Sequence, residues 1–200
     1  MIKDSPLWYR LIRLSVYVIF KILFNLIIRG KEKIPLRGGV ILVSNHSSYL
    51  DPVVLGLTTP RRINFMAKEE LFKNFFFRRL ITLLGAFPVK RGEIDKFAYR
   101  KVLSIARREE IIALFPEGTR GNGKKLGILR KGAVKLIFKT KLPVIPVIIK
   151  GTEKALPRGK KMIRLKKIRA YVGDSLRKID RESIFYEELT KKMNELFKSV

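Results

Sequence analysis

The sequence predicts an α/β fold: a single-domain sandwich in which a largely parallel or mixed sheet is flanked by helices. Two observations lead to this prediction. Short runs of β-branched residues alternate along the chain with longer segments whose apolar residues recur at helical spacing. The chain also has 200 residues, of which 46% are hydrophobic, and this is enough for one domain with a sizeable core.

The predicted strands are short apolar runs bounded by turn-forming residues. They cover residues 40–43, 63–66, 87–89, 111–115, 144–149 and 168–172. The predicted helices carry apolar residues three and four positions apart and cover residues 52–57, 75–84, 94–108, 131–139 and 183–198. In α/β folds ligands collect at the carboxyl ends of the strands, so we expect a functional site in the loops that follow the strands.

An amphipathic helix is predicted ahead of this alternation, between Leu7 and Ile28. Its polar residues are three or four positions apart, which gathers them into one stripe: Arg10, Arg13, Tyr17, Lys21 and Asn25. A spanning helix would place Lys21 near the hydrocarbon midplane at a cost of about 3 kcal/mol, whereas a helix lying in the interface keeps the stripe in water. We therefore expect residues 1–30 to form a membrane-interface helix and residues 31–200 to form the α/β domain. The alternative is a helix packed on the protein's own core.

The chain is strongly basic, with 44 Lys and Arg residues against 17 Asp and Glu residues and a formal net charge of +27. Such a charge attracts polyanions, which leaves nucleic acid, an anionic membrane surface and an acidic protein as candidate partners. The densest run of cations, Arg158 to Arg169, contains no acid, and taken alone it is typical of a solvated loop or strand. The absence of Cys and the presence of one His exclude disulfides, a cysteine nucleophile and a metal site built from several histidines.

The single histidine, His46, lies in the loop that follows the strand at residues 40–43. An imidazole can act as both acid and base near neutral pH. Asp51, five residues later, can hold one ring nitrogen and leave the other free to accept a proton from a substrate hydroxyl. Asp51 precedes Pro52 and is also a good helix N-cap, and the two roles are compatible. A lone histidine is more often structural, but its place directly after an apolar strand favours a function.

A second loop, which follows the strand at residues 111–115, has the composition of an anion-binding site. Gly118 lets the backbone approach a ligand, Thr119 offers a hydroxyl donor, and the guanidinium fork of Arg120 suits phosphate oxygens. Glu117 is unusual in such a loop, and we expect it either to orient Arg120 or to accept a substrate hydroxyl. An ordinary glycine turn with exposed charges is the alternative.

A third loop, residues 85–92, ends in two cations, Lys90 and Arg91, beside a glycine. Arg91, assisted by Lys90, can supply a second contact to a phosphate. Taken alone, this segment is more typical of a solvated basic turn.

These segments occur in the order and separation of four sequence blocks of the glycerolipid acyltransferase family, which the chain resembles. The likeness is greatest to the bacterial 1-acylglycerol-3-phosphate acyltransferases and covers roughly residues 40–149. The blocks are Asn45-His46 with Asp51, Gly85 to Arg91, Phe115 to Arg120, and Val144 to Val147. The first and third match without substitution, whereas the second has Pro88 where the family usually has an aromatic or aliphatic residue.

The resemblance implies an enzyme that moves an acyl group from a thioester to the 2-hydroxyl of lysophosphatidic acid, giving phosphatidic acid. It implies that His46 is the general base and Asp51 its orienting partner. It also implies that one set of residues binds the substrate phosphate: Lys90, Arg91, Glu117, Gly118, Thr119 and Arg120. The fourth block is implied to be a structural strand.

We expect direct transfer, because the chain has no Cys and no serine within a Gly-x-Ser-x-Gly turn. No cofactor or metal is expected, since a thioester is already activated; the co-substrate is a thioester of acyl carrier protein or of coenzyme A. The expected partners are this acyl donor and the phospholipid membrane surface. The expected location is the cytoplasmic face of the cell membrane, as a peripheral or monotopic protein.

Three alternatives remain open at this point. The acceptor can be another lysolipid, such as a lyso-ornithine lipid or lysophosphatidylglycerol. The chain can be a basic nucleic-acid-binding protein, although its aromatic residues lie mainly in apolar runs such as Phe75-Phe76-Phe77 and are not interleaved with cations as stacking platforms would be; we therefore expect no nucleic-acid partner. A membrane-surface scaffold without chemistry would leave the pairing of His46 with Asp51 unexplained.

Overall fold

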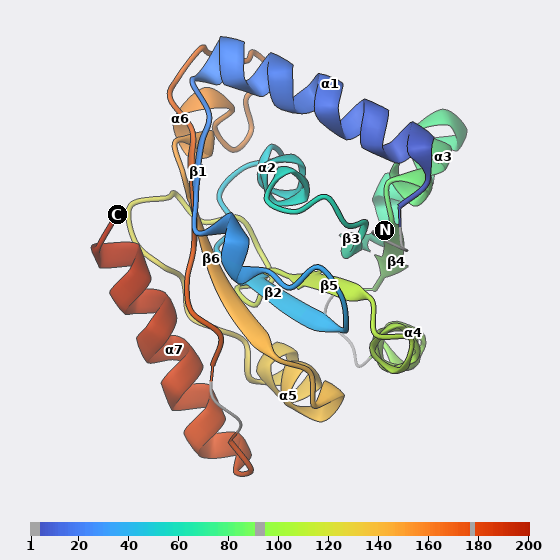
Figure 1. The fold of residues 1–200 in the computed structure, drawn as a ribbon, viewed down its shortest axis with the longest axis vertical. Helices are drawn as coiled ribbons and strands as arrows, with labels where there is room; N and C mark the ends of the chain where they lie inside the picture. Colours follow the sequence, from blue (N-terminus) through green and yellow to red (C-terminus); the bar gives the residue numbers. More distant parts are fainter. Residues whose placement is uncertain (1–4, 91–94, 177–178) are drawn as a thin grey trace.

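A seven-stranded sheet forms the centre of the computed structural model, which describes residues 5–90, 95–176 and 179–200 (Figure 1). The strands are β1 (Ile27–Arg29), β2 (Val40–Ser44), β3 (Ile63–Lys68), β4 (Ala86–Val89), β5 (Ile111–Leu114), β6 (Val144–Lys150) and β7 (Arg169–Val172). Their order across the sheet is β1-β7-β6-β2-β5-β3-β4. Neighbouring strands are parallel except β6 and β7, which are antiparallel. The predicted α/β class with a largely parallel, mixed sheet is confirmed.

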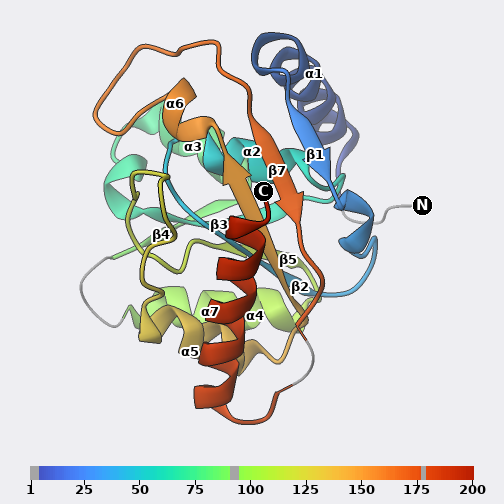
Figure 2. The ribbon, with the colours of Figure 1, turned by 90° about the vertical axis from the view of Figure 1, so that its left-hand side faces the viewer.

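Helices cover both faces of this sheet (Figures 1 and 2). They are α1 (Leu7–Phe24), α2 (Asp51–Leu57), α3 (Phe75–Leu83), α4 (Lys96–Arg107), α5 (Lys131–Thr140), α6 (Thr152–Ala155) and α7 (Glu182–Lys198), with short 3-10 turns η1 (Lys31–Lys33) and η2 (Glu69–Phe72). Side chains alternate across each strand, so β2 sends Leu42 into the core shared with α1 and α2, and Ile41 and Val43 into the core shared with α4, α5 and α7.

The amino-terminal helix is shorter than the sequence indicates. It ends at Phe24, because Asn25 adopts a left-handed conformation (φ 45°) that asparagine tolerates better than most residues. Ile27–Arg29 then forms β1, which pairs in parallel with β7 at the edge of the sheet. The expected helix over residues 7–28 is therefore wrong in its last turn, where a short apolar run is compatible with either a helix or a strand.

The expectation that the polar stripe of this segment lies in water holds for Arg10, Lys21 and Asn25, which are exposed, but not for the rest of the stripe. Tyr9, Phe20 and Phe24 are buried, and Arg13 and Tyr17 from the stripe are half-buried against the protein. Large apolar side chains face outward instead: Leu7, Leu11, Ile12, Leu14, Val18, Ile19, Ile22 and Leu23. The helix thus packs on the core through one face and exposes an apolar face. No bilayer-spanning segment is found among the helices of the described ranges.

Candidate active site

His46 and Asp51 form a hydrogen-bonded pair in the loop between β2 and α2. His46 Nδ1 lies 2.9 Å from Asp51 Oδ2. Asp51 is completely buried, whereas the His46 side chain keeps 11% of its surface exposed. Because an ionised carboxylate can only accept hydrogen bonds, Nδ1 carries the proton in the neutral ring and Nε2 keeps its lone pair. This arrangement suits an imidazole that accepts a proton from a substrate hydroxyl.

The Asp51 carboxylate accepts hydrogen bonds from several groups besides the imidazole. Oδ2 also accepts the backbone N–H groups of Ser47 (2.6 Å) and Ser48 (2.8 Å), and Oδ1 accepts the hydroxyl of Thr152 at 2.5 Å. Asp51 is the first residue of α2 and makes no capping bond to that helix, whose N-cap position is Leu50. The expected capping role is therefore wrong: the carboxylate is occupied in fixing the loop that carries the histidine.

The same loop is attached to the two strands beside β2. The Asn45 side-chain amide both donates to Ile149 O (2.9 Å) and accepts from Ile149 N (2.8 Å), at the end of β6. The His46 ring stacks on the Phe115 ring just after β5, with 4.4 Å between centroids and 25° between planes. Because β5, β2 and β6 are parallel neighbours, their carboxyl ends meet at one edge of the sheet, and the loop that carries the imidazole is attached there to the segments on both sides.

Glu117 bonds to the backbone of the histidine loop and to a second segment of the chain. Its Oε1 accepts the backbone N–H of His46 (2.8 Å) and its Oε2 accepts that of Gly127 (3.0 Å). Burial of the carboxyl raises the pKa of Glu117, which the two backbone donors oppose. Glu117 makes no ion pair with Arg120 in the part of the chain that the structure describes, so the expected orienting contact to that residue is not formed.

The other three predicted residues of the loop after β5, Gly118, Thr119 and Arg120, have different surroundings. The Arg120 guanidinium lies 3.7 Å above the centroid of the Tyr49 ring, in a cation–π contact. Thr119 is exposed. Gly118 has φ +68°, and a Cβ added there would come within 2.5 Å of Nε of Arg130. The turn therefore requires glycine both for its conformation and for the space that Arg130 fills.

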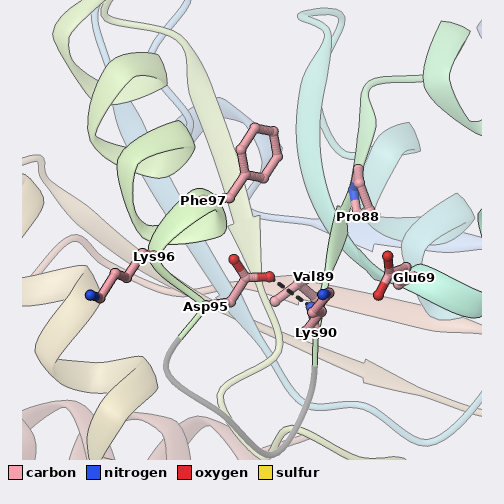
Figure 3. Close-up of a pocket in the computed structure, with 7 residues that line it drawn as sticks. All are labelled: Glu69, Pro88, Val89, Lys90, Asp95, Lys96 and Phe97. Atoms are coloured by element: carbon pink, nitrogen blue, oxygen red, sulfur yellow. Dashed lines mark hydrogen bonds between the residues drawn. The ribbon is translucent and has the colours of Figure 1, made fainter.

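The predicted Lys90 lies away from the histidine pair, and Arg91 lies outside the described residues. Lys90 is exposed and follows β4, an edge strand that accommodates Pro88 because no ladder partner needs its N–H. Its backbone N–H donates to Asp95 Oδ2 (2.8 Å), beside a cavity of about 450 Å³ (Figure 3). A larger cavity of about 960 Å³ is lined by residues that include parts of β4, α3 and α4.

Neither cavity is lined by His46 or Arg120. These two cavities therefore do not connect Lys90 with the histidine pair. The candidate active site is defined by the hydrogen bond between His46 and Asp51 and by the bonds that hold Asp51, because these contacts determine proton transfer whereas cavity volume does not.

Sequence reasoning named Asn45 within the first block without assigning it a role, and it missed Thr152; the structure shows that Asn45 bonds to Ile149 and that Thr152 donates to Asp51. Thr152 follows Gly151 directly after β6, so its place behind a strand was a usable signal. Its contact with Asp51 spans 101 positions, however, and depends on β6 lying beside β2. That neighbour relation is not readable from either segment alone.

The fold and the site define a class of protein: an α/β protein with a histidine–carboxylate pair at the carboxyl edge of its parallel strands. Comparison with known proteins refines this class. The family model described as Acyltransferase matches residues 25–150, and the chain belongs to that family. The resemblance found in the sequence is confirmed.

Named relatives agree with this assignment. The chain is 27% identical over 173 residues to the 1-acyl-sn-glycerol-3-phosphate acyltransferase of Bacillus subtilis, a match that covers 86% of this chain and 84% of the relative. It is 30% identical over 130 residues to the enzyme of the same name from Borreliella burgdorferi, covering 64% of this chain and 52% of that relative. The crystal structure of the 1-acyl-sn-glycerophosphate (LPA) acyltransferase PlsC from Thermotoga maritima superposes with a TM-score of 0.82 at 25% identity, covering 95% of this chain and 78% of that one.

Proposed function

We propose that this protein is a 1-acyl-sn-glycerol-3-phosphate acyltransferase, which moves an acyl group from a thioester to the 2-hydroxyl of lysophosphatidic acid and yields phosphatidic acid. The observation that carries the proposal is the bond between His46 Nδ1 and the buried carboxylate of Asp51. Membership of the Acyltransferase family and the names of the relatives support the acyl chemistry and the acceptor.

In the proposed mechanism the imidazole acts as general base. His46 Nε2 takes the proton of the acceptor hydroxyl as that oxygen attacks the thioester carbonyl, and the Asp51 carboxylate stabilises the resulting imidazolium. The C–S bond then breaks, and the imidazolium returns the proton to the departing thiolate. Products are an ester and a free thiol, so atoms and charge balance without an acyl-enzyme. General-base assistance of this kind accelerates a reaction roughly 10²- to 10⁴-fold.

The acceptor's phosphate is proposed to bind near Arg120. The guanidinium is positioned by the Tyr49 ring on one face, which leaves its N–H edge for phosphate oxygens. Thr119 is exposed beside it and can add a hydroxyl donor. We assign Glu117 and Gly118 a supporting role in shaping this loop, and we keep Lys90 and Arg91 as further phosphate contacts.

The acyl donor is proposed to be a thioester of acyl carrier protein or coenzyme A, with no cofactor or metal, because a thioester carbonyl is already activated. We propose that the protein works at the cytoplasmic face of the cell membrane as a peripheral or monotopic protein. The outward apolar face of α1 supports this proposal, since large contiguous apolar surfaces mark binding to a membrane or partner.

A transfer assay tests the proposed function. The full chain is incubated with lysophosphatidic acid, lysophosphatidylglycerol or lyso-ornithine lipid and with either donor, and products are identified by mass. We expect phosphatidic acid to form with a kcat/KM well above that for the other two acceptors. Preference for the phosphate-free lyso-ornithine lipid would refute the acceptor assignment, and absence of any acyl product would refute the enzyme activity.

A further inference from the structure

The loop that joins α6 to β7 carries the densest run of cations in the chain and has no part in the proposed mechanism. Every residue from 158 to 167 is exposed. Six of these ten residues are basic: Arg158, Lys160, Lys161, Arg164, Lys166 and Lys167. None of the six forms an ion pair with a carboxylate of the described residues. The protein itself therefore does not neutralise this charge.

Large apolar side chains are interleaved with these cations. Met162, Ile163 and Leu165 are 81%, 55% and 67% exposed. A loop that only has to be soluble gains nothing from three such side chains in water, whereas cations alternating with apolar residues are typical of segments that lie in a membrane interface. The loop is also tied to α6, because the Arg164 N–H donates to Ala155 O at 2.7 Å.

The position of this basic loop connects it both to α1 and to the active site. Ile168, the residue that follows this stretch, donates its backbone N–H to Phe24 O (3.0 Å) and accepts the N–H of Ile27 at its carbonyl (3.1 Å), at the end of α1. Figures 1 and 2 show the loop, in orange, and α1, in blue, at the same end of the molecule. At the loop's other end, Arg158 Nη1 donates to the carbonyl of Arg120 at 2.9 Å.

We propose that residues 158–167 form a second membrane-contact element, which binds an anionic phospholipid bilayer beside the active site. Met162, Ile163 and Leu165 enter the headgroup region, and the surrounding cations bind lipid phosphates. The inference rests on the proposed function only because the lysolipid substrate of that reaction lies in a bilayer. Charge complementarity and the position of the loop at the same end of the molecule as α1 favour a lipid surface over an acidic carrier protein, which would leave the three apolar side chains without a role.

Vesicle cosedimentation of the full chain tests this proposal. The variant Lys160→Gln, Lys161→Gln, Lys166→Gln is compared with Lys131→Gln, Lys135→Gln, Lys139→Gln, which removes three exposed charges from α5 at the opposite end of the molecule (Figures 1 and 2). Each cation near an anionic surface strengthens partitioning roughly fivefold, so we expect the loop variant to lose at least about tenfold in affinity for phosphatidylcholine vesicles containing phosphatidylglycerol. The α5 variant should lose less than about twofold. Equal losses, or no loss in the loop variant, would overturn the proposal.

A fluorescent reporter on the otherwise unaltered loop provides a test that does not depend on charge removal. The chain has one Trp, so Trp8→Phe with Ile163→Trp places the only indole in the loop, and Trp8→Phe with Lys135→Trp is the matched control. We expect a blue shift and quenching by brominated lipid only for the reporter at position 163. An unshifted, unquenched reporter there would contradict insertion.

Activity measurements separate this proposal from its rival and from the proposed function. In detergent micelles, where vesicle docking is not needed, the loop variant should keep the native kcat. If it binds vesicles like the native chain but raises KM for the carrier-protein thioester and not for the coenzyme A thioester, the loop belongs to the carrier protein and the membrane proposal is wrong. Failure of the native chain to form phosphatidic acid in micelles would refute the proposed function alone, because the vesicle comparison would stand unaffected.

Discussion

A single buried carboxylate organises the site at the level of individual residues. Asp51 accepts hydrogen bonds from the His46 ring, from two backbone N–H groups and from the Thr152 hydroxyl. Such a fully bonded carboxylate stabilises its negative charge without water and holds the imidazole in one tautomer. The local part of this arrangement was predictable, since Asp51 follows His46 by five residues. The donor from Thr152 was not, because it depends on long-range strand pairing.

Thr152 is expected to act as a positioning residue. Thr152→Val keeps the shape but removes the hydroxyl, and loss of a hydrogen bond to a buried charge costs about 1 to 3 kcal/mol. We expect kcat to fall roughly tenfold while KM for lysophosphatidic acid stays near native, and Thr152→Ser should recover most of the rate. Steady-state kinetics of the three proteins check this. A rise in KM with unchanged kcat, or no recovery with serine, would contradict a positioning role.

Arg120 is expected to act on acceptor binding rather than on the chemical step. Arg120→Ala removes charge-assisted hydrogen bonds worth about 1.5 to 3 kcal/mol, so KM for lysophosphatidic acid should rise roughly 10- to 100-fold. Arg120→Lys keeps the charge without the planar fork and should be intermediate. Lys135→Ala on α5 is the control and should leave KM unchanged. An unchanged KM in Arg120→Ala would remove its phosphate assignment.

Glu117 makes stability depend on pH in a defined direction. Because burial raises the pKa of Glu117, the folded state holds the proton more tightly than the unfolded chain. Its stabilising contribution is complete below the unfolded pKa and is lost as pH rises through the higher folded pKa. The free energy of unfolding of the native chain, relative to Glu117→Gln, should therefore decrease as pH rises above about 4.3. Urea unfolding of both proteins across this range measures the difference, and a relative increase with pH would show the opposite shift.

At the level of elements, the central part of the fold was predictable and its amino-terminal edge was not. Six strands and five helices follow from apolar runs that are long enough to show their period. β1 and α6 are three and four residues long, too short for any periodicity. Packing of α1 on the protein's own core was left open as an alternative, and the sequence did not show that Arg13 and Tyr17 lie on the side of the buried Phe20 and Phe24 rings, because that follows only from the contact with the rest of the domain.

The packing of α1 predicts that it contributes to the stability of the whole domain. Phe24 is 4% exposed and lies in the core shared with α2, whereas Ile22 on the same helix is 74% exposed. Phe24→Ala should lower the free energy of unfolding by about 3 to 5 kcal/mol, and Ile22→Ala by less than about 0.5 kcal/mol. Denaturant unfolding distinguishes them. Similar small changes in both variants would indicate a helix that folds independently of residues 31–200.

At the level of the whole molecule, the sheet places the histidine pair near the two surfaces that we propose to contact lipid. The carboxyl ends of β5, β2 and β6 hold the histidine pair, and the loop after α6 joins that region to the end of α1. Net charge alone predicted an anionic partner but did not identify which one. Our proposal of a lipid surface rests on the apolar side chains that the fold leaves exposed on α1 and on the basic loop.

The most direct test of the account is the rate of acyl transfer to lysophosphatidic acid by His46→Ala, measured beside the native chain with circular dichroism as a control for folding. Loss of a general base predicts a rate about 10²- to 10⁴-fold lower, with an unchanged spectrum and unchanged vesicle binding. A folded His46→Ala protein that keeps more than a few per cent of the native rate would show that another group takes the proton.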